Sequence, residues 1–490
     1  MRTRFPPSPT GFLHIGSLRT ALMNHLLSKQ TKGNFLMRIE DTDRERLVPG
    51  AVENMLRGLA WAGIMPDEGV MLDPNGEVIQ RGAHGPYFQS ERLPLYKKYA
   101  DELIQKGHAY HCFCTPERLQ EMRKQQEARK QAPMYDRHCL QLSKEDVDAK
   151  LKAGERHVIR MQVPHERTII FTDDIRGEMR FQGHTVDDQV LLKSDGFPTY
   201  HLAHVVDDHL METDLVIRGE EWLSSLPKHL LLLEWLGWTP PKYAHVPLLL
   251  SKDRKKLSKR DGDVAVEEYI TKGYLPEAMV NFLALLGWNP GTTQEIFTMQ
   301  ELIEQFSLDR VQKAGAIVDM EKLDWLQGQW MRKIPLQEFA ARIQPIVSAK
   351  LPAAKSDPDF PKKAQLIQER ITFFHEAPQM LTWFYEEPRV TVELLANEKQ
   401  KVTKVQLPEI FATLEKILSA VPEKEWTAEG LKATVLANLG NFKQGQLLWP
   451  LRAALTGLPY SPGAFEVAAA LGKENSLQRL HLAKKLVKSE

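Results

Sequence analysis

The pattern of hydrophobic residues changes near Leu323, and this change limits what the chain can fold into. Before it, strand-like runs at residues 2–5 and 35–39 flank a segment with helical spacing at residues 18–28, which is a βαβ pattern. After it, amphipathic helical segments follow one another with few alternating runs. We therefore predict an α/β N-terminal part and an all-helical C-terminal part.

Length and composition indicate an ordinary globular protein with several domains. The chain has 490 residues, of which 42% are hydrophobic and 26% are charged. No apolar run approaches the roughly 18 to 20 residues that cross a bilayer, and the first residues lack the features of a signal or transit peptide. The 3 cysteines are too few for a disulfide framework. We expect a cytoplasmic protein without a membrane partner, or one of an organellar matrix if a transit segment has been removed.

Positive charge is local, because 64 basic residues balance 64 acidic ones. Residues 252–260 are densely basic and contain Asp253 as their one acidic side chain. Lys256, Ser258 and Lys259 lie within this stretch, and lysines there can neutralise charge that develops on a pyrophosphate leaving group. A solvated basic loop is the alternative interpretation.

The N-terminal segment combines a proline-rich turn with a histidine. The turn RFPPSPTG at residues 4–11 is followed by His14-Ile15-Gly16-Ser17, where a helix begins. Glycines permit a close approach of the backbone, and the N–H groups at a helix N-terminus favour an anion. We interpret this turn as a phosphate site, the alternative being a structural turn with an incidental histidine.

Together with further motifs, these two stretches resemble the class I glutamyl-tRNA synthetases of the bacterial and organellar type. The other motifs are RIEDTD at residues 38–43, DGFPTYHL at 195–202, VVDDH at 205–209 and IRGEEW at 217–222. The resemblance implies a Rossmann-type catalytic domain with a connective insertion, followed by all-helical anticodon-binding domains. The implied ranges are 1–107 and 191–250 for the catalytic domain, 108–190 for the insertion, 251–323 for the loop and stem-contact domain, and 324–490 for the helical domains.

The resemblance also implies the residues that handle ATP. His14 and Gly16 stand at the HIGH signature, and Lys256, Ser258 and Lys259 at the KMSKS signature; these five are the implied catalytic residues. ATP would enter with Mg²⁺, which phosphates and water largely hold. Pro6 departs from the family, which more often has alanine there. The implied ATP-binding residues are Thr10, Gly11, His14, Gly16, Ser17 and Lys259.

A glutamate pocket needs about two cations and one anion, because the substrate carries two carboxylates and one ammonium. Arg4 and Arg218 match the cations, and Glu40 matches the anion. A buried guanidinium left without its carboxylate would discriminate against glutamine. The residues that the resemblance adds to this pocket are Ser8, Tyr200, His204, Glu221 and Trp222.

All three cysteines fall in one cluster, which resembles the zinc site of some family members. Three thiolates and one oxygen or nitrogen would complete a tetrahedron. Gln141 stands where the commoner variant has a histidine, so three reduced thiols are the alternative. The candidate zinc ligands are Cys112, Cys114, Tyr135 and Cys139.

The helical third separates this chain from relatives that carry β-barrels in that position. Arg370 lies near where some family members place an arginine that reads the last anticodon base. Residues 352–361 are the expected inter-domain linker, with a surface loop as the alternative. The implied activity is glutamate activation and its transfer to tRNA-Glu by a monomer. Charging of tRNA-Gln as well, or a catalytically inactive tRNA-binding paralogue, are the alternatives that the sequence leaves open.

Overall fold

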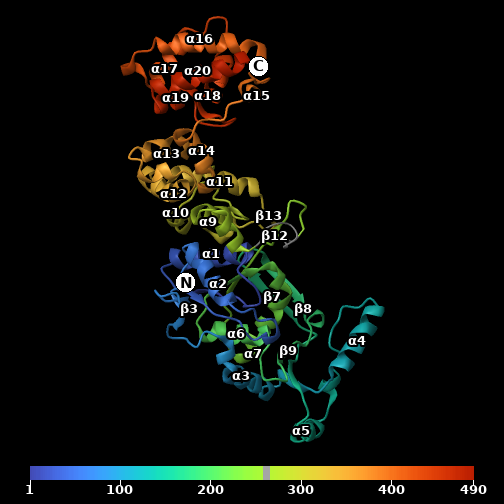
Figure 1. Cartoon of the computed structure of the whole chain (residues 1–490). Helices are drawn as coiled ribbons and strands as arrows, with labels where there is room; N and C mark the ends of the chain where they lie inside the picture. Colours follow the sequence, from blue (N-terminus) through green and yellow to red (C-terminus); the bar gives the residue numbers. More distant parts are fainter. Residues whose placement is uncertain (256, 258–264, 490) are drawn as a thin grey trace. The chain divides into compact units, whose positions relative to one another are not determined.

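The computed structural model describes residues 1–255, 257 and 265–489, and it divides into two compact units (Figure 1). Unit 1 contains Met1–Lys272 and Pro276–Leu323, and unit 2 contains Gly273–Leu275 and Asp324–Glu490. Helix α11 (Met320–Lys333) contains the boundary between them. Among the described residues, no helix combines the length and the apolar character that crossing a membrane requires.

Unit 1 is built on a six-stranded sheet with the order β11, β10, β1, β2, β3, β4. Neighbouring strands in this sheet are parallel, except that β3 and β4 are antiparallel. Successive strands run outward from β1 on one side and from β10 on the other, so the strand order reverses between them. Ligands bind at the carboxyl ends of the strands beside such a reversal. The strands are β1 (Thr3–Phe5), β2 (Phe35–Met37), β3 (Glu68–Leu72), β4 (Val78–Arg81), β10 (Leu215–Gly219) and β11 (Lys242–Val246).

Helices connect and cover this sheet. Helix α1 follows β1 and buries Leu18, Leu22 and Leu26, the residues whose spacing predicted it. Helix α6 precedes β10, and α7 connects β10 to β11 before ending at Gly237, where a φ of 77° favours glycine. The helices are α1 (Ile15–Gln30), α2 (Ala51–Trp61), α3 (Leu93–Gln105), α6 (Tyr200–Leu210) and α7 (Leu226–Leu236).

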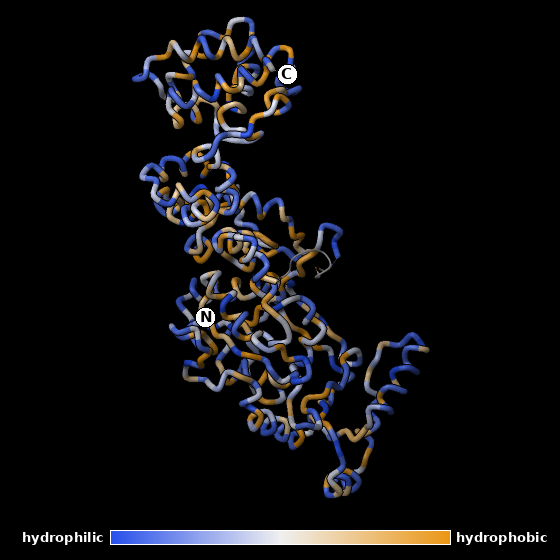
Figure 2. Tube along the Cα trace, viewed as in Figure 1, coloured by the Kyte–Doolittle hydropathy of each residue, from blue (hydrophilic) through white to orange (hydrophobic). Residues whose placement is uncertain are grey.

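An insertion interrupts the α/β pattern between α3 and α6. It contains a three-stranded antiparallel sheet, β5 (Ala109–Cys112), β6 (Val158–Met161) and β9 (Val190–Leu192), and a hairpin of β7 (Thr168–Asp173) and β8 (Gly177–Gln182). Its helices are α4 (Pro116–Ala128) and α5 (Lys144–Lys152). Helix α4 buries none of its side chains, and Figure 2 shows it as mostly hydrophilic.

Unit 1 ends in a mainly helical part that follows β11. The two short strands there pair in parallel, Leu249 with Ala316 and Leu250 with Ile317. The elements of this part are β12 (Leu249–Leu250), β13 (Ala316–Ile317), α8 (Val266–Lys272), α9 (Pro276–Leu285) and α10 (Met299–Gln305).

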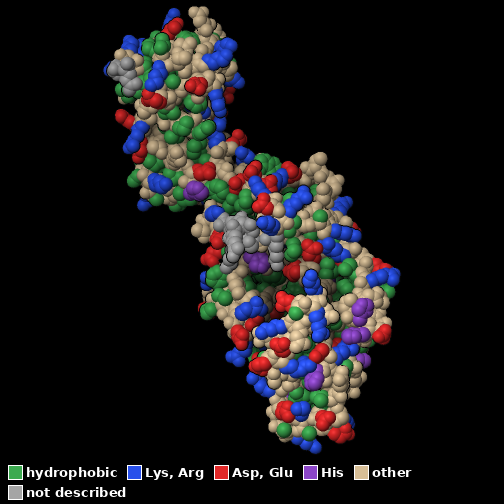
Figure 3. All heavy atoms as spheres, turned by 90° about the vertical axis from the view of Figure 1, so that its right-hand side faces the viewer, with side chains coloured by type: hydrophobic (Ala, Val, Ile, Leu, Met, Phe, Trp, Pro, Cys, Tyr) green, Lys and Arg blue, Asp and Glu red, His purple; other side chains and the backbone are tan. Residues whose placement is uncertain are grey.

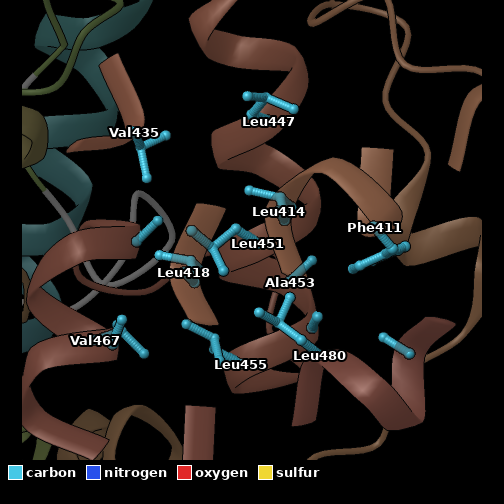
Figure 4. Close-up of a cluster of buried hydrophobic side chains, with 14 of the residues drawn as sticks. Phe411, Leu414, Leu418, Val435, Leu447, Leu451, Ala453, Leu455, Val467 and Leu480 are labelled. Atoms are coloured by element: carbon cyan, nitrogen blue, oxygen red, sulfur yellow. The ribbon is translucent and has the colours of Figure 1, made fainter. Parts of the chain in front are cut away.

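The described part of unit 2 is helical, as predicted, and leucine-rich helices enclose a hydrophobic core near its C-terminal end (Figure 4). Phe411, Leu414 and Leu451 are fully buried in this core. The helices after α11 are α12 (Leu336–Lys350), α13 (Phe360–Gln368), α14 (Ala377–Tyr385), α15 (Val392–Leu395), α16 (Leu407–Ser419), α17 (Ala428–Ala437), α18 (Gln444–Thr456), α19 (Ala464–Leu471) and α20 (Lys473–Ser489).

The prediction of an inter-domain linker at 352–361 is wrong. This segment connects α12 and α13, which pack on each other within unit 2. Ala354 and Phe360 are buried, and Nε2 of Gln344 donates a hydrogen bond to the Ala354 carbonyl at 3.1 Å. Prolines and charged residues mark a loop there, but its buried apolar side chains anchor it.

Candidate active site

The turn between β1 and α1 ends in a histidine that caps the helix. Nδ1 of His14 accepts a hydrogen bond from the backbone N–H of Ser17 at 3.1 Å, and Oγ of Ser17 lies 2.9 Å from Nε2. A Cβ at Gly16 would lie 3.2 Å from the His14 ring, so glycine lets the imidazole rest on the first turn. The other N–H groups of this turn present the positive end of the helix dipole, which suits a phosphate.

The loop before His14 leaves room for a ligand. A Cβ at Gly11 would have no described atom within 4 Å, so the space beside this glycine is open among the described residues. Thr10 is partly exposed in the same loop. Helix α2 anchors this loop, because the backbone N–H of Leu13 donates a hydrogen bond to Oδ1 of Asn54 at 3.0 Å.

The segment that follows the basic motif returns to this turn. Lys256, Ser258 and Lys259 lie outside the described residues. Shortly after them, Ala265 forms an antiparallel bridge with His14, and the backbone N–H of Val266 donates to the Leu13 carbonyl at 2.9 Å. The chain therefore reaches the histidine turn directly after the basic motif.

Arg4 lies on β1 and is almost fully buried, with 1% of its surface exposed. Its Nε donates to both carboxylate oxygens of Asp208, at 3.2 and 3.1 Å. Arg38 Nη1 donates to the same carboxylate at 2.9 Å. Burial alone would raise the pKa of Asp208, but the charges of Arg4 and Arg38 and a hydrogen bond from His204 hold it well below its ordinary value. Nη1 of Arg4 has no hydrogen-bond partner among the described residues, so it can bind a substrate oxygen.

Glu40 lies just beyond β2, where the backbone continues to run beside the turn after β1. Its N–H donates to the Pro7 carbonyl at 3.0 Å, and Ser8 Oγ donates to the Glu40 carbonyl at 2.9 Å. The side chain accepts from Nη2 of Arg38 at 3.0 Å. Burial raises the pKa of Glu40 to about 7 against the opposing charge of Arg38. A cationic group in the pocket would favour the ionised form.

Arg218, on β10, is buried among neutral acceptors. Three imidazoles surround its guanidinium: Nε2 of His245 lies 2.9 Å from Nε, Nδ1 of His229 lies 3.1 Å from Nη1, and Nε2 of His204 lies 3.4 Å from Nη1. Burial lowers the pKa of each imidazole, to about 3 for His204. Among the residues that the structure describes, no carboxylate forms an ion pair with Arg218, so this buried cation is available to a substrate carboxylate.

A second contact fixes the orientation of each imidazole ring, and the ring nitrogen that faces away from Arg218 makes this contact. Because arginine only donates, an imidazole nitrogen that accepts from Arg218 carries no proton, and a neutral ring then has its proton on the opposite nitrogen. The pairs that this nitrogen forms are His204 with Asp208 at 2.9 Å, His229 with His201 at 3.2 Å, and His245 with Asp173 at 2.6 Å.

Arg4 and Arg218 both lie near the aromatic ring of Tyr200. Tyr200 OH accepts from Nη1 of Arg218 at 3.1 Å, and its ring lies 4.2 Å from that of Trp222. Burial raises the pKa of Tyr200, and the charges of Arg218, Glu40 and Arg4 also act on it, so all of these groups lie around this ring. Glu221 and Ser8 are exposed, whereas the other predicted pocket residues are buried or half-buried; the carboxylate of Glu221 lies beside Gly219.

Three side chains of this site were missed by sequence reasoning: Asp208, His229 and His245. Asp208 lies in the VVDDH motif, where two successive aspartates are both buried, against the usual exposure of such residues. His229 and His245 stand in apolar runs, where a lone histidine gives no signal of its partner. Their roles depend on contacts between segments that are distant in the sequence.

The cysteine cluster forms a compact set of donors in the insertion. The sulfurs of Cys112, Cys114 and Cys139 lie within 4.8 Å of one another. The Tyr135 hydroxyl lies 3.3 Å from the sulfur of Cys112 and 3.2 Å from that of Cys114. Burial raises the pKa of the Cys114 thiol to about 12, with Cys112 as a further cause. The donor set has the number and softness that a zinc ion requires.

In unit 2, Arg370 forms an exposed ion pair with Glu466, with 3.1 Å between Nη2 and Oε2. Burial lowers the pKa of Arg452, and the charge of Arg370 lowers it further, so the two arginines lie close together. Arg452 also stacks on the ring of Trp449 at 4.7 Å. This surface combines positive charge with aromatic rings.

Figure 3 shows a hollow in the surface of unit 1 with basic, acidic and histidine side chains around it. Residues 1–325 match the family of class I tRNA synthetases (E and Q), catalytic domain, and residues 338–484 match an anticodon binding domain. Glutamate–tRNA ligase of Chlorobaculum parvum is 44% identical over 499 residues, covering 98% of this chain and 97% of that protein. The corresponding ligase of Alkaliphilus metalliredigens is also 44% identical and covers 99% of both chains.

A solved structure agrees with these relatives. The crystal structure of a glutamate tRNA ligase from Elizabethkingia meningosepticum in complex with its amino acid has a TM-score of 0.84, 34% identity, and coverage of 99% of both chains. The similarity covers both units, and the reversal in the sheet lies where a ligand is expected. The chain therefore belongs to the class I aminoacyl-tRNA synthetases of the glutamate and glutamine group.

Proposed function

We propose that this chain is a glutamate–tRNA ligase. The observation that carries the proposal is the pair of buried arginines, Arg4 and Arg218, with Glu40 beside the same tyrosine ring. Two cations and one anion match the two carboxylates and the ammonium of glutamate. The names of the relatives support the same substrate.

Catalysis would rest on positioning and electrostatics. A glutamate carboxylate oxygen attacks the α-phosphate of ATP, which forms the mixed anhydride glutamyl-adenylate and releases pyrophosphate. The terminal ribose hydroxyl of tRNA then attacks the carbonyl carbon of this anhydride and releases AMP. His14 and the α1 N-terminus would hold the triphosphate, and Lys256 and Lys259 would neutralise the leaving group. Magnesium would accompany ATP, bound largely through phosphates and water.

The direct test is an aminoacylation assay with purified tRNA-Glu and tRNA-Gln, each with glutamate and with glutamine. We expect glutamate on tRNA-Glu and no transfer of glutamine. Glutamate on tRNA-Gln as well would assign the enzyme to the non-discriminating type. An absence of ATP–pyrophosphate exchange even with tRNA-Glu would refute the enzymatic function and favour an inactive tRNA-binding paralogue.

The KM for glutamate is expected to fall as the pH rises from about 6 to about 8. Glu40 has a pKa of about 7 in the empty pocket, so it is mostly protonated below that pH and cannot pair with the ammonium group. Raising the pH ionises Glu40 and strengthens binding. In Glu40→Gln the KM should be higher and independent of pH in this range.

Glu45→Gln is the matched control, because Glu45 is an exposed carboxylate on the same connection. It should retain the pH dependence of the wild type. An unchanged pH profile in Glu40→Gln would refute the role of Glu40 as the partner of the ammonium group.

We also propose that Cys112, Cys114 and Cys139 bind one structural zinc ion with the Tyr135 oxygen as the fourth ligand. The ion would join the end of β5 to the segment after α4, a part of the chain with few other buried side chains. Its role is to hold the insertion together and not to take part in the reaction.

Protein purified without chelator is therefore expected to contain about one zinc ion per chain by elemental analysis. Cys139→Ser should lower this content and accelerate hydrogen exchange around residues 112–141. Zinc far below one per chain in the wild type would leave the three reduced thiols as the correct interpretation. His138→Ala is the control, because it removes a neighbouring side chain of a type that can bind metals. This variant should keep the zinc if the proposed ligand set is right.

For unit 2 we propose that the surface around Arg370 and Arg452 contacts the anticodon loop. Single-stranded RNA loops are bound by bases stacking on aromatic and guanidinium groups. Tyr460 lies close enough to Arg452 to affect the pKa of that guanidinium, and it is 79% exposed, so its ring can offer such a face. The Arg370–Glu466 pair would have to open for Arg370 to bind a base.

A further inference from the structure

The β7–β8 hairpin of the insertion reaches a side chain of the glutamate pocket. Asp173, the last residue of β7, is fully buried. Its Oδ1 accepts hydrogen bonds from the backbone N–H groups of Ile175 and Arg176 at 3.0 and 2.9 Å, which fixes the turn of the hairpin. Its Oδ2 lies 2.6 Å from Nδ1 of His245, on β11. One carboxylate thus ties the hairpin to the central sheet.

His245 connects Asp173 to Arg218. Its Nε2 lies 2.9 Å from Nε of Arg218, and arginine can only donate in that contact. His245 must therefore be neutral with its proton on Nδ1, where Asp173 accepts it. The hydrogen bonds run in one direction, from Arg218 to His245 to Asp173.

The contact with His245 differs from the other two histidine contacts. His204 and His229 both approach Nη1 of Arg218, whereas His245 alone among the three approaches Nε. Partners at both Nε and Nη1 define the plane of the guanidinium, since the group is rigid and planar. Nη2 makes a longer contact of 3.5 Å with the Trp222 carbonyl, which leaves it the more available of the two amino groups.

Arg176, in the turn of the hairpin, makes a second set of contacts close to Arg218. Arg176 donates from Nη2 to Glu220 at 2.5 Å and from Nε to the His245 carbonyl at 3.3 Å. Glu220 follows Arg218 by two residues, and its other oxygen accepts from the Leu248 backbone at 2.9 Å. The hairpin turn is therefore bound both to the strand of His245 and to the segment that follows Arg218.

We propose that Asp173 and His245 are positioning residues for glutamate binding, through which the insertion hairpin sets the orientation of Arg218. This inference rests on the proposed function, because it assigns the oriented guanidinium to a glutamate carboxylate. A misplaced guanidinium would lose a charge-assisted hydrogen bond to the substrate. None of the proposed ATP-binding residues is a partner in these hydrogen bonds, so we expect ATP binding to be independent of them.

Asp173→Asn tests the proton on His245 with little change of shape. The asparagine oxygen can still accept from the turn, but its amide group offers protons to His245 Nδ1. His245 would then carry its proton on Nε2, facing the Nε–H of Arg218. We expect the KM for glutamate to rise roughly 10- to 100-fold, the range of a charged hydrogen bond, with the KM for ATP unchanged.

Two substitutions of His245 separate positioning from general support of the fold. His245→Gln places an amide near the original Nε2, where its oxygen can accept from Arg218, so its glutamate KM should stay within about three-fold of the wild type. His245→Asn keeps a donor for Asp173 but leaves Arg218 Nε without an acceptor, so its KM should rise as in Asp173→Asn. In the His245→Gln background, Asp173→Asn should add little, because glutamine has no tautomer to switch.

The measurement is ATP–pyrophosphate exchange with cognate tRNA, titrating glutamate and ATP separately in the full-length variants. Equal glutamate KM values for His245→Asn and His245→Gln would overturn the proposal, as would parallel rises in the KM values for glutamate and ATP. A wild-type enzyme that does not activate glutamate at all would instead refute the proposed function, so the two failures are distinguishable.

Discussion

Replacing Arg218 by alanine is expected to lower kcat/KM for glutamate in adenylate formation by about 10³-fold or more. Arg218 is 5% exposed, and its guanidinium contacts three neutral imidazoles and no carboxylate among the described residues. A site built around such a group loses both the charge and the hydrogen bonds to the substrate when the group is removed. Arg218→Lys should restore little, because lysine cannot offer the planar fork that these acceptors fit.

The experiment is steady-state ATP–pyrophosphate exchange with tRNA, varying glutamate at saturating ATP. Arg180→Ala is the matched control, since Arg180 lies on β8 with 62% of its side chain exposed and pairs only with Glu178 among the described residues. This control should keep wild-type kinetics. A loss of less than about ten-fold in Arg218→Ala would show that Arg218 does not bind a glutamate carboxylate.

Much of the fold could be predicted from local patterns. The helical spacing of Leu18, Leu22 and Leu26 predicted α1, which is buried on most of its surface because it packs against both the sheet and α9. The change near Leu323 coincides with the boundary between the compact units because amphipathic helices without strands build a separate core. The sheet order could not be predicted in this way, since parallel neighbours such as β1 and β10 are more than 200 residues apart.

Some residues of the candidate site could likewise be predicted from the sequence, and others could not. Arg4, Glu40 and Arg218 could be singled out from the sequence because their charges would match glutamate and each lies within a recognisable motif. The acceptors that hold these charges could not, because Asp173 lies in an insertion and His245 in an apolar strand. A hydrogen bond between them follows only from the way the hairpin folds back on the sheet. Glu221 was predicted from a motif alone, and its exposed side chain shows how little a motif says about orientation.

Asp208→Asn is expected to destabilise unit 1 by about 3–5 kcal/mol, the effect of breaking a buried ion pair. The Asp208 carboxylate accepts from Arg4 and Arg38 and lies 2.9 Å from Nδ1 of His204. Asparagine would keep the shape but remove the charge, and its amide protons would face other donors. Hydrogen exchange by mass spectrometry is the suitable measurement, because it follows β1, β2 and β10 separately from unit 2.

The pH dependence of this loss distinguishes charge from shape. The pKa of Asp208 lies well below its ordinary value in the folded protein. Its stabilising contribution is therefore complete above an unfolded pKa of about 3.9 and is lost as the pH falls through the folded value. The difference between wild type and Asp208→Asn should be constant near neutral pH and shrink in acid. Asp101→Asn, which removes one partner of the exposed Lys97–Asp101 pair, should change stability by less than about 1 kcal/mol. A comparable loss in both variants would contradict the assignment of Asp208 as the central anion of this site.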